Sequence, residues 1–128
     1  MNETYNEHFT DLDFSEVDFP EGTIEACVFT KCNLNGVSLA RRKFVDCTFS
    51  ECDLSSASLN LTWLQGAKFE ECKLLGLRFD HCQEYGFQVE FVKCLLDHSS
   101  FFEVSLVKSG FRDCRMHRVD MALSLIHI

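Results

Sequence analysis

Residues 29–54 read FTKCNLNGVSLARRKFVDCTFSECDL, with a large apolar residue at every fifth position. The spacing extends back to Phe9 and forward to Phe79, slips by two residues within 83–88, and resumes at Phe91. A period of five matches neither the roughly 3.6-residue repeat of an α-helix nor the alternation of an ordinary strand, so the chain must turn after every pentad. The apolar positions, here named centres, are Phe9, Phe14, Phe19, Ile24, Phe29, Leu34, Leu39, Phe44, Phe49, Leu54, Leu59, Leu64, Phe69, Leu74, Phe79, Phe91, Leu96, Phe101, Leu106, Phe111, Met116, Met121 and Ile126.

A second selective position lies two residues before each centre, and small or apolar residues fill most of these positions. All the cysteines fall there: Cys27, Cys32, Cys47, Cys52, Cys72, Cys82, Cys94 and Cys114. No Cys-x-x-Cys pair with the spacing of a zinc knuckle is present. Because free cysteine behaves as a small buried hydrophobe, we interpret this position as an inward slot and expect no metal and no cofactor.

The segments FTKCNL (29–34), FSECDL (49–54), SSASL (55–59) and FEECKL (69–74) resemble the pentapeptide-repeat family. The loose motif of that family is a small residue, then Asp or Asn, then Leu or Phe, then two variable residues. The resemblance implies an all-β fold, a right-handed quadrilateral β-helix in which four pentads form one square coil. It therefore predicts a super-period of 20 residues.

The sequence supports this super-period, because one set of every fourth centre, starting at Phe9, is a column of identical residues. That column reads Phe9, Phe29, Phe49, Phe69, Phe91 and Phe111 when the segment 83–88 counts as one pentad. The slip is therefore interpreted as a two-residue outward bulge within a continuous solenoid of about six coils. We expect residues 1–8 to be a lead-in and residues 9–128 to form a single β-helix domain.

The formal net charge of the chain is -8, and the excess of acidic residues lies at the N-terminus. Residues 1–25 contain no Lys or Arg, and the acidic N-terminal face is expected to comprise Asp11, Asp13, Glu16, Asp18, Glu21 and Glu25. The N-terminus has neither the basic nor the apolar region of a signal peptide, and no stretch approaches the ~18 apolar residues of a membrane span. These features predict a cytoplasmic protein without membrane contact.

Candidate catalytic residues are few, and the repeat explains most of them as packing residues. Asp97, His98 and Ser99 supply the residue types of a hydrolytic triad, but neighbours on an extended chain point in different directions and Ser99 falls in the inward slot. A core filled with Phe and Leu leaves no internal pocket. Buried Phe residues and the lack of net positive charge also argue against direct nucleic-acid binding. We therefore predict that the protein is not an enzyme.

Breaks in the repeat indicate where a partner could bind. Arg42 occupies an inward slot, so either the chain bulges there or the guanidinium reaches a partner. The bulge is expected to expose Tyr85 and Phe87 near two outward apolar residues of the preceding coil. The 20-residue period places the following residues near one edge of the rod: Arg41, Lys43, Leu61, Trp63, His81, Tyr85 and Phe87. Trp, Tyr and Arg are enriched in binding hot spots, whereas the alternative is a scatter of ordinary surface apolar residues.

The C-terminal coil places Leu123, Leu125 and Ile128 in outward positions and has no polar or helical cap. An uncovered terminal strand favours pairing with another chain. Two alternatives follow: an end-to-end homodimer through this coil, or truncation of a longer protein.

The Cys-rich pentads, including FVDCTF (44–49), FDHC (79–82) and FRDC (111–114), are most similar to the quinolone-resistance (Qnr) branch of the family. That resemblance implies an acidic rod that imitates duplex DNA and binds a type II topoisomerase, DNA gyrase or topoisomerase IV. The alternative is a general protein-interaction scaffold or structural module with no role at a topoisomerase.

Overall fold

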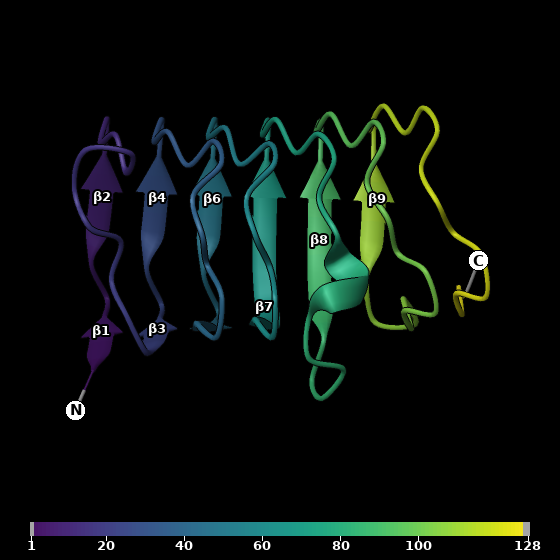
Figure 1. Ribbon diagram of the computed structural model, residues 1–128, viewed down its shortest axis with the longest axis horizontal. Coiled ribbons are helices and arrows are strands. Elements are labelled where there is room, and N and C mark those ends of the chain that lie inside the picture. The colour runs from purple at the N-terminus through teal and green to yellow at the C-terminus, as the bar shows by residue number, and fades with distance from the viewer. Residues whose placement is uncertain (1, 127–128) are drawn as a thin grey trace.

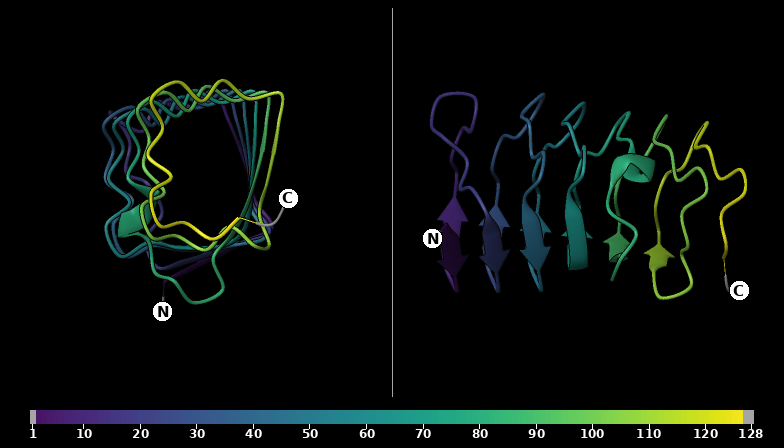
Figure 2. Two further views of the ribbon diagram at one scale, coloured as in Figure 1. Left: turned by 90° about the vertical axis from the view of Figure 1, so that its right-hand side faces the viewer. Right: turned by 60° about the horizontal axis from the view of Figure 1, so that its bottom comes forward.

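The computed structural model describes residues 2–126, which form a rod of stacked coils with the two ends of the chain at opposite ends (Figure 1). Seen along the rod, each coil is four-sided (Figure 2). The predicted all-β quadrilateral β-helix is confirmed. The elements are β1 (Glu3–Tyr5), β2 (His8–Thr10), β3 (Thr23–Glu25), β4 (Val28–Thr30), β5 (Lys43–Val45), β6 (Thr48–Ser50), β7 (Trp63–Glu70), the 3-10 helix η1 (Phe79–His81), β8 (Gln88–Val92) and β9 (Gly110–Arg112).

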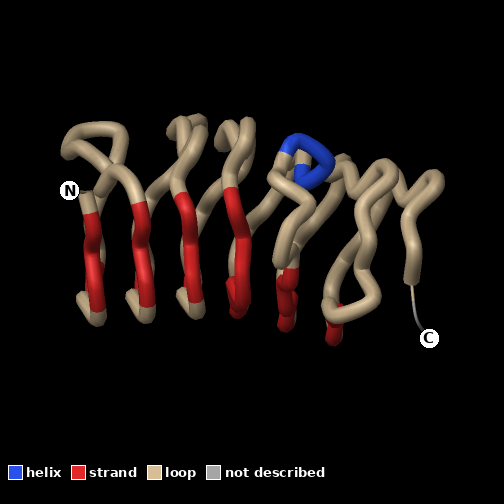
Figure 3. Tube along the Cα trace, turned by 90° about the horizontal axis from the view of Figure 1, so that it is seen from below, coloured by secondary structure: helices blue, strands red, loops and turns tan. Residues whose placement is uncertain are grey.

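The strands pair in parallel with the strands of the next coil, so two adjacent sides of the rod form one sheet (Figure 3). One ladder runs β1–β3–β5–β7 and the other β2–β4–β6–β7, continued by β8 and β9. Phe9 pairs with Phe29 and Phe29 with Phe49, which is a step of 20 residues. On the other two sides successive coils meet through isolated bridges such as Asn33 to Asp53 and Ser38 to Ser58.

The solenoid begins earlier than the apolar repeat predicts. Residues 3–5 form β1, which pairs with β3 with Thr4 opposite Ile24, and His8 lies in β2. The expected lead-in of residues 1–8 is thus largely part of the first coil. Thr4 is polar at a centre position, which hid this pentad from the apolar repeat.

The core consists of the centres together with the small and apolar residues of the inward slots, and the predicted phenylalanine column is present. Rings of adjacent coils stack, with centroids 4.9 Å apart for Phe9 and Phe29, and 4.8 Å for Phe29 and Phe49. The stack continues through Phe69 and Phe91 to Phe111. Offset stacking of this kind adds to the free energy of burying the rings, and each ring depends on the coils on both sides.

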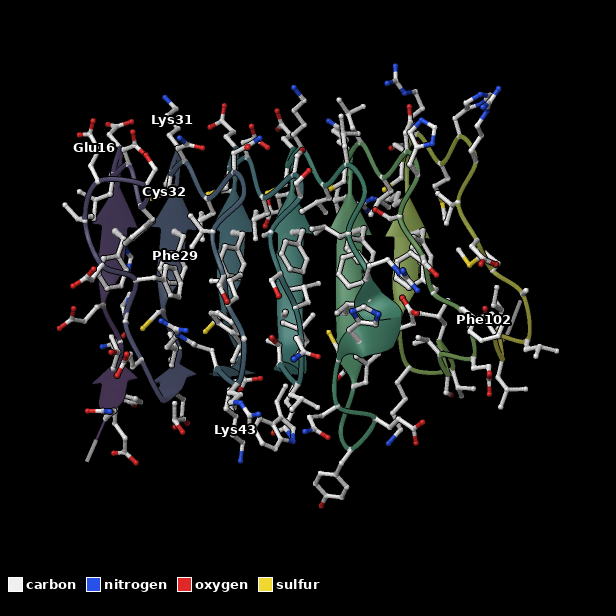
Figure 4. All side chains as sticks on the ribbon, in the orientation of Figure 1. Glu16, Phe29, Lys31, Cys32, Lys43 and Phe102 are labelled. Carbon is white, nitrogen blue, oxygen red and sulfur yellow. The ribbon has the colours of Figure 1, made fainter. Side chains whose placement is uncertain are left out.

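The corners of the coils share one backbone feature. In most pentads the residue two positions after the centre has a positive φ, for example 53° at Lys31, 53° at Glu51 and 69° at Gly36. This left-handed conformation disfavours most side chains, so the turn is maintained by the pairing and packing on either side of it. The side chains at these corners point away from the rod, as Lys31 does in Figure 4, while Phe29 points inward.

The inward slots have a hydrogen-bonding role in addition to packing. The thiol of Cys32 donates to the carbonyl of Phe9 at 3.5 Å, and that of Cys52 donates to Phe29 at 3.3 Å. In each case the acceptor is the centre one coil earlier. Hydroxyls take the same place, since Thr62 Oγ1 donates to the carbonyl of Leu39 at 2.8 Å. Among residues 2–126 no buried side-chain nitrogen or oxygen lacks a hydrogen-bond partner.

The segment 83–88 is an outward bulge, and the coil continues past it as predicted. Gln83 N–H still donates to the carbonyl of Thr62 at 2.8 Å, and the chain rejoins the sheet where Gln88 pairs with Gln65. Beyond this point β8 pairs with β7 at an offset of 22 residues, as for Phe69 and Phe91. The bulge projects from one side of the square when the rod is viewed along its axis (Figure 2).

The last described coil is joined to the rod by bridges such as Ser105 to Leu125. Leu123 and Leu125 are 75% and 64% exposed, which agrees with their predicted outward positions. Ile128 lies outside the described residues. No helix within residues 2–126 is both long enough and apolar enough to cross a membrane.

Candidate functional site

Arg42 lies in an inward slot and its guanidinium reaches three backbone carbonyls. Nε donates to Pro20 at 3.0 Å, one terminal nitrogen donates to Ala40 at 3.3 Å and the other to Phe19 at 3.4 Å. Pro20 and Phe19 belong to the preceding coil. The longer Arg42 side chain therefore donates hydrogen bonds to that coil, as the thiols do from other inward slots. The sequence is compatible with either a local bulge or a hydrogen-bonding partner for the guanidinium, and the structure shows the second.

The neighbouring corner brings several predicted site residues together. Arg41 and Leu61 occupy the left-handed position of successive coils, with φ of 64° and 58°. The Leu61 N–H donates to the carbonyl of His81 at 2.9 Å, which places His81 above Leu61 in the following coil. On the adjoining side Lys43 pairs with Trp63 in the β5–β7 ladder. Two short columns, one at the corner and one on the strand, therefore run side by side along the rod.

The bulge completes this edge with Tyr85, which is 83% exposed. Gln65 Nε2 donates to the carbonyl of Tyr85 at 3.3 Å and so connects the bulge to β7, the strand that contains Trp63. Six residues form this surface, the Trp63 edge: Arg41, Lys43, Leu61, Trp63, His81 and Tyr85. Arg41 and His81 are exposed, whereas Lys43, Leu61 and Trp63 are half-buried.

Phe87 departs from the expectation. It is half-buried and packs against the core instead of standing exposed beside Tyr85. The reason is its position one residue before β8, where the chain has already turned back toward the rod and Gln88 pairs with Gln65. Phe87 therefore does not belong to the Trp63 edge.

On the other side of the bulge the coil leaves a hollow of about 720 Å³. Its lining includes Phe87, Phe102, Val104, Glu84, Glu103 and Ser105. The interior of the coils is filled by the stacked centres, as expected, but this external hollow was not predicted. It exists because the displaced bulge leaves a gap against the following coil.

The acidic residues surround the first coil instead of lining one face of the rod. Asp11 lies at a corner with φ of 56°, Glu16 lies in the turn that follows Asp13, and Glu25 lies in β3. These three residues, Asp18 and Glu21 are all exposed. Figure 4 shows Glu16 pointing outward at the N-terminal end.

The sixth acidic residue, Asp13, stabilises the turn that follows it. Ser15 donates both its hydroxyl and its backbone N–H to Asp13 Oδ1, at 2.6 and 3.0 Å, and Asn33 of the next coil donates at 3.1 Å. The hydrogen bonds from Ser15 hold the pKa of the Asp13 carboxyl below its usual value.

The cysteines are free thiols held in the slots. Burial raises the pKa of Cys47 to about 11, and burial also raises the pKa of Cys82. No group of three or more metal-binding side chains that could hold an ion occurs within residues 2–126. The geometry indicates packing and hydrogen bonding as the roles of these thiols.

The triad residue types do not assemble. Arg115 Nε donates to Asp97 Oδ2 at 2.9 Å, and the backbone N–H of His117 donates to Asp97 Oδ1 at 3.1 Å. The Ser99 hydroxyl points the other way and donates to the carbonyl of Leu74 at 2.7 Å. The hydrogen bond from Arg115 lowers the pKa of the Asp97 carboxyl. Because Arg115 and His117 lie in the next coil, Asp97 connects two coils.

A sequence model described as a pentapeptide repeat region matches residues 5–79. The solved structure of Rfr23, a pentapeptide repeat protein from the cyanobacterium Cyanothece 51142, is similar with a TM-score of 0.55 at 10% identity, over 98% of this chain and 88% of that one. Full-length QnrB1, a plasmid-mediated fluoroquinolone resistance protein, gives a TM-score of 0.36 at 13% identity, over 98% and 93% of the two chains. No curated protein matches this chain. At these identities the likeness to solved structures concerns the fold alone.

Proposed function

Because this chain belongs to the pentapeptide-repeat family, we propose that it is a non-catalytic, cytoplasmic rod that binds another protein through the Trp63 edge. The observation that carries this proposal is the alignment of Arg41 with Leu61 and of Lys43 with Trp63 in successive coils, next to the exposed Tyr85. Trp, Tyr and Arg are enriched among the hot spots of protein interfaces. The cytoplasm is the compartment in which free thiols remain reduced.

The edge differs from a scatter of surface apolar residues because its centre, Lys43 and Trp63, lies on two paired strands. Trp63 lies in β7 and its N–H donates to the carbonyl of Arg42 at 2.9 Å. A half-buried ring on a paired strand loses little conformational freedom when a partner covers it, which favours binding.

The test compares three immobilised baits: the wild-type chain, the double variant Trp63→Ala with Tyr85→Ala, and the control Lys31→Ala with Glu51→Ala. Lys31 and Glu51 are exposed corner residues outside the Trp63 edge. Quantitative mass spectrometry of retained proteins should find at least one protein kept by wild type and control and reduced about tenfold or more by the edge variant. Equal recovery on all three baits would contradict the proposal.

A second candidate is binding to DNA gyrase or topoisomerase IV, as the resemblance to the quinolone-resistance branch implies. The feature that favours it is the acid-rich first coil, since clustered carboxylates produce a negative field comparable to that of phosphates. It predicts that the purified chain changes gyrase supercoiling or quinolone inhibition, and that Asp11→Asn, Glu16→Gln, Asp18→Asn and Glu21→Gln together remove the effect. No effect over a broad concentration range would leave the Trp63 edge as the remaining candidate.

A further inference from the structure

One side of the rod carries a ladder of backbone hydrogen bonds that can be followed from coil to coil. The N–H of Lys43 donates to Gly22 at 3.0 Å, and that of Trp63 donates to Arg42 at 2.9 Å. The corresponding Gln83 N–H donates to Thr62 at 2.8 Å. At this position of each coil the backbone N–H thus donates to a carbonyl about one coil earlier.

Ser105 is the next residue of this series and its bonds toward the preceding coil are missing. Within the described part of the chain its N–H donates no hydrogen bond and its C=O accepts none. On its far side the ladder is intact, because Ser105 bridges Leu125, Leu125 N–H donates to Val104, and Leu106 N–H donates to Leu125. Ser105 therefore presents both backbone groups toward the preceding coil, as a residue of an edge strand does.

The cause of the missing bonds is the bulge. The Phe87 N–H donates to Glu84 at 3.2 Å, which closes a turn within the bulge. The backbone that would have paired with Ser105 is thereby carried outward. The hollow of about 720 Å³ occupies the vacated place.

The side chains around the hollow provide an apolar floor and an acidic rim. Phe87 and Val104 are half-buried and pack against the core, and Phe102, labelled in Figure 4, lines the same space. Glu84 and Glu103 are both exposed.

The balance of charge at the rim is negative. Asp80 also lines the hollow, but its carboxylate is paired with Arg78 at 2.7 Å. Among the described lining residues Lys108 is the single basic one, and the carboxylates of Glu84 and Glu103 form no ion pair with any residue in 2–126. This favours an occupant that carries positive charge.

We propose that this hollow binds an extended peptide segment of a partner protein, which adds a strand beside Ser105. The peptide backbone would pair with the N–H and C=O of Ser105, an apolar side chain would pack on Phe87 and Val104, and a basic side chain would meet Glu84 and Glu103. Addition of a strand to an open sheet edge supplies affinity through main-chain bonds and specificity through side-chain pockets. A volume of about 720 Å³ lies within the usual range of ligand pockets, roughly 300–1,000 Å³.

This inference does not depend on the Trp63 edge, because none of the six edge residues takes part in it. The proposal can therefore fail while the proposed function stands, and the reverse also holds.

The test is an NMR titration of the 15N-labelled chain with a nine-residue peptide of alternating valine and lysine, with a valine–glutamate peptide of the same length as control. We expect the valine–lysine peptide to shift the Ser105 amide and slow its hydrogen exchange, and to bind at least about fivefold more tightly than the control. Trp63→Ala should leave this binding unchanged.

Two variants test the two parts of the site. Ser105→Pro removes the unpaired N–H without removing a ladder bond, and Glu84→Lys with Glu103→Lys reverses the rim charge at exposed positions. Each should weaken the valine–lysine peptide about fivefold or more, and the charge-reversed variant decides the matter if the proline variant does not fold. An unshifted Ser105 amide, equal binding of both peptides, or self-association that occupies the hollow would overturn the proposal.

Discussion

The thiol of Cys47 donates a hydrogen bond to the backbone carbonyl of Ile24, 3.2 Å away and one coil earlier. Ile24 is a buried centre, so this carbonyl has no access to bulk water when the coil above it is in place. Where an inward slot holds Cys, Thr or Ser, the side chain makes this bond, as Thr62 and Ser99 also do, whereas an apolar slot residue such as Ala57 contributes packing alone.

Cys47→Ser should remove part of the alkaline instability of the protein. Burial raises the pKa of Cys47 from 9.0 to about 11, so the native state keeps its proton where the unfolded chain loses it. Stability therefore falls as the pH rises from about 9 to about 11, by roughly 2–3 kcal/mol for this group. Urea unfolding at pH 8 and pH 10.5 should show a smaller loss for the serine variant, and an equal loss in both proteins would refute the assignment.

Phe49→Ala should be among the most damaging single substitutions. The Phe49 ring is 1% exposed and stacks on both Phe29 and Phe69, at 4.8 and 5.0 Å. Loss of such a side chain leaves a cavity and costs about 3–5 kcal/mol. Phe9→Ala provides the control, because Phe9 is half-buried at the end of the column, and its cost in urea unfolding should be clearly smaller.

Arg42→Ala should destabilise the protein, although arginine usually lies on a protein surface. Three carbonyls lose their donor, and a buried carbonyl left unpaired costs about 1–3 kcal/mol. Arg41→Ala changes the adjacent, exposed arginine and should cost less than about 0.5 kcal/mol. Similar unfolding midpoints for the two variants would show that the guanidinium contacts contribute little.

Two glycines of like conformation should respond differently to alanine. Gly36 and Gly66 have φ of +69° and +82°, so both substitutions incur backbone strain of about 1 kcal/mol. A Cβ at Gly36 meets nothing within 4 Å, whereas one at Gly66 would lie 2.6 Å from Asp46 Oδ1. Because the Asp46 carboxylate ends an exposed side chain and can turn aside, Gly66→Ala should lower the thermal midpoint only slightly more than Gly36→Ala, and the reverse order would contradict this.

The five-residue period was sufficient to predict the stacked core, because a centre such as Phe29 has the same chemistry in every coil. It failed at Thr4, where a polar residue takes a centre position and yet pairs with Ile24. The hydrogen bonds of the β1–β3 ladder join backbone groups and do not depend on the side chain. The first strand therefore forms without an apolar residue at its centre position.

The site was predicted less completely than the fold. Register alone aligned Arg41 with Leu61 and Lys43 with Trp63, and the structure keeps that order. Register could not decide the direction of Phe87, because an insertion reveals how many residues are added and not where the chain turns back. The open backbone of Ser105 follows from that turn and has no signature in the sequence.

The bulge also has a practical consequence for altering the protein. Gln83 and Gln88 hold the two ends of the bulge on the ladder, through bonds to Thr62 and pairing with Gln65, and the coils beyond it stack in regular order. The length of the segment between them is therefore uncoupled from the register of the rod. Tyr85 marks a position at which a foreign loop can be grafted, so that the solenoid serves as a carrier while every later coil keeps its place.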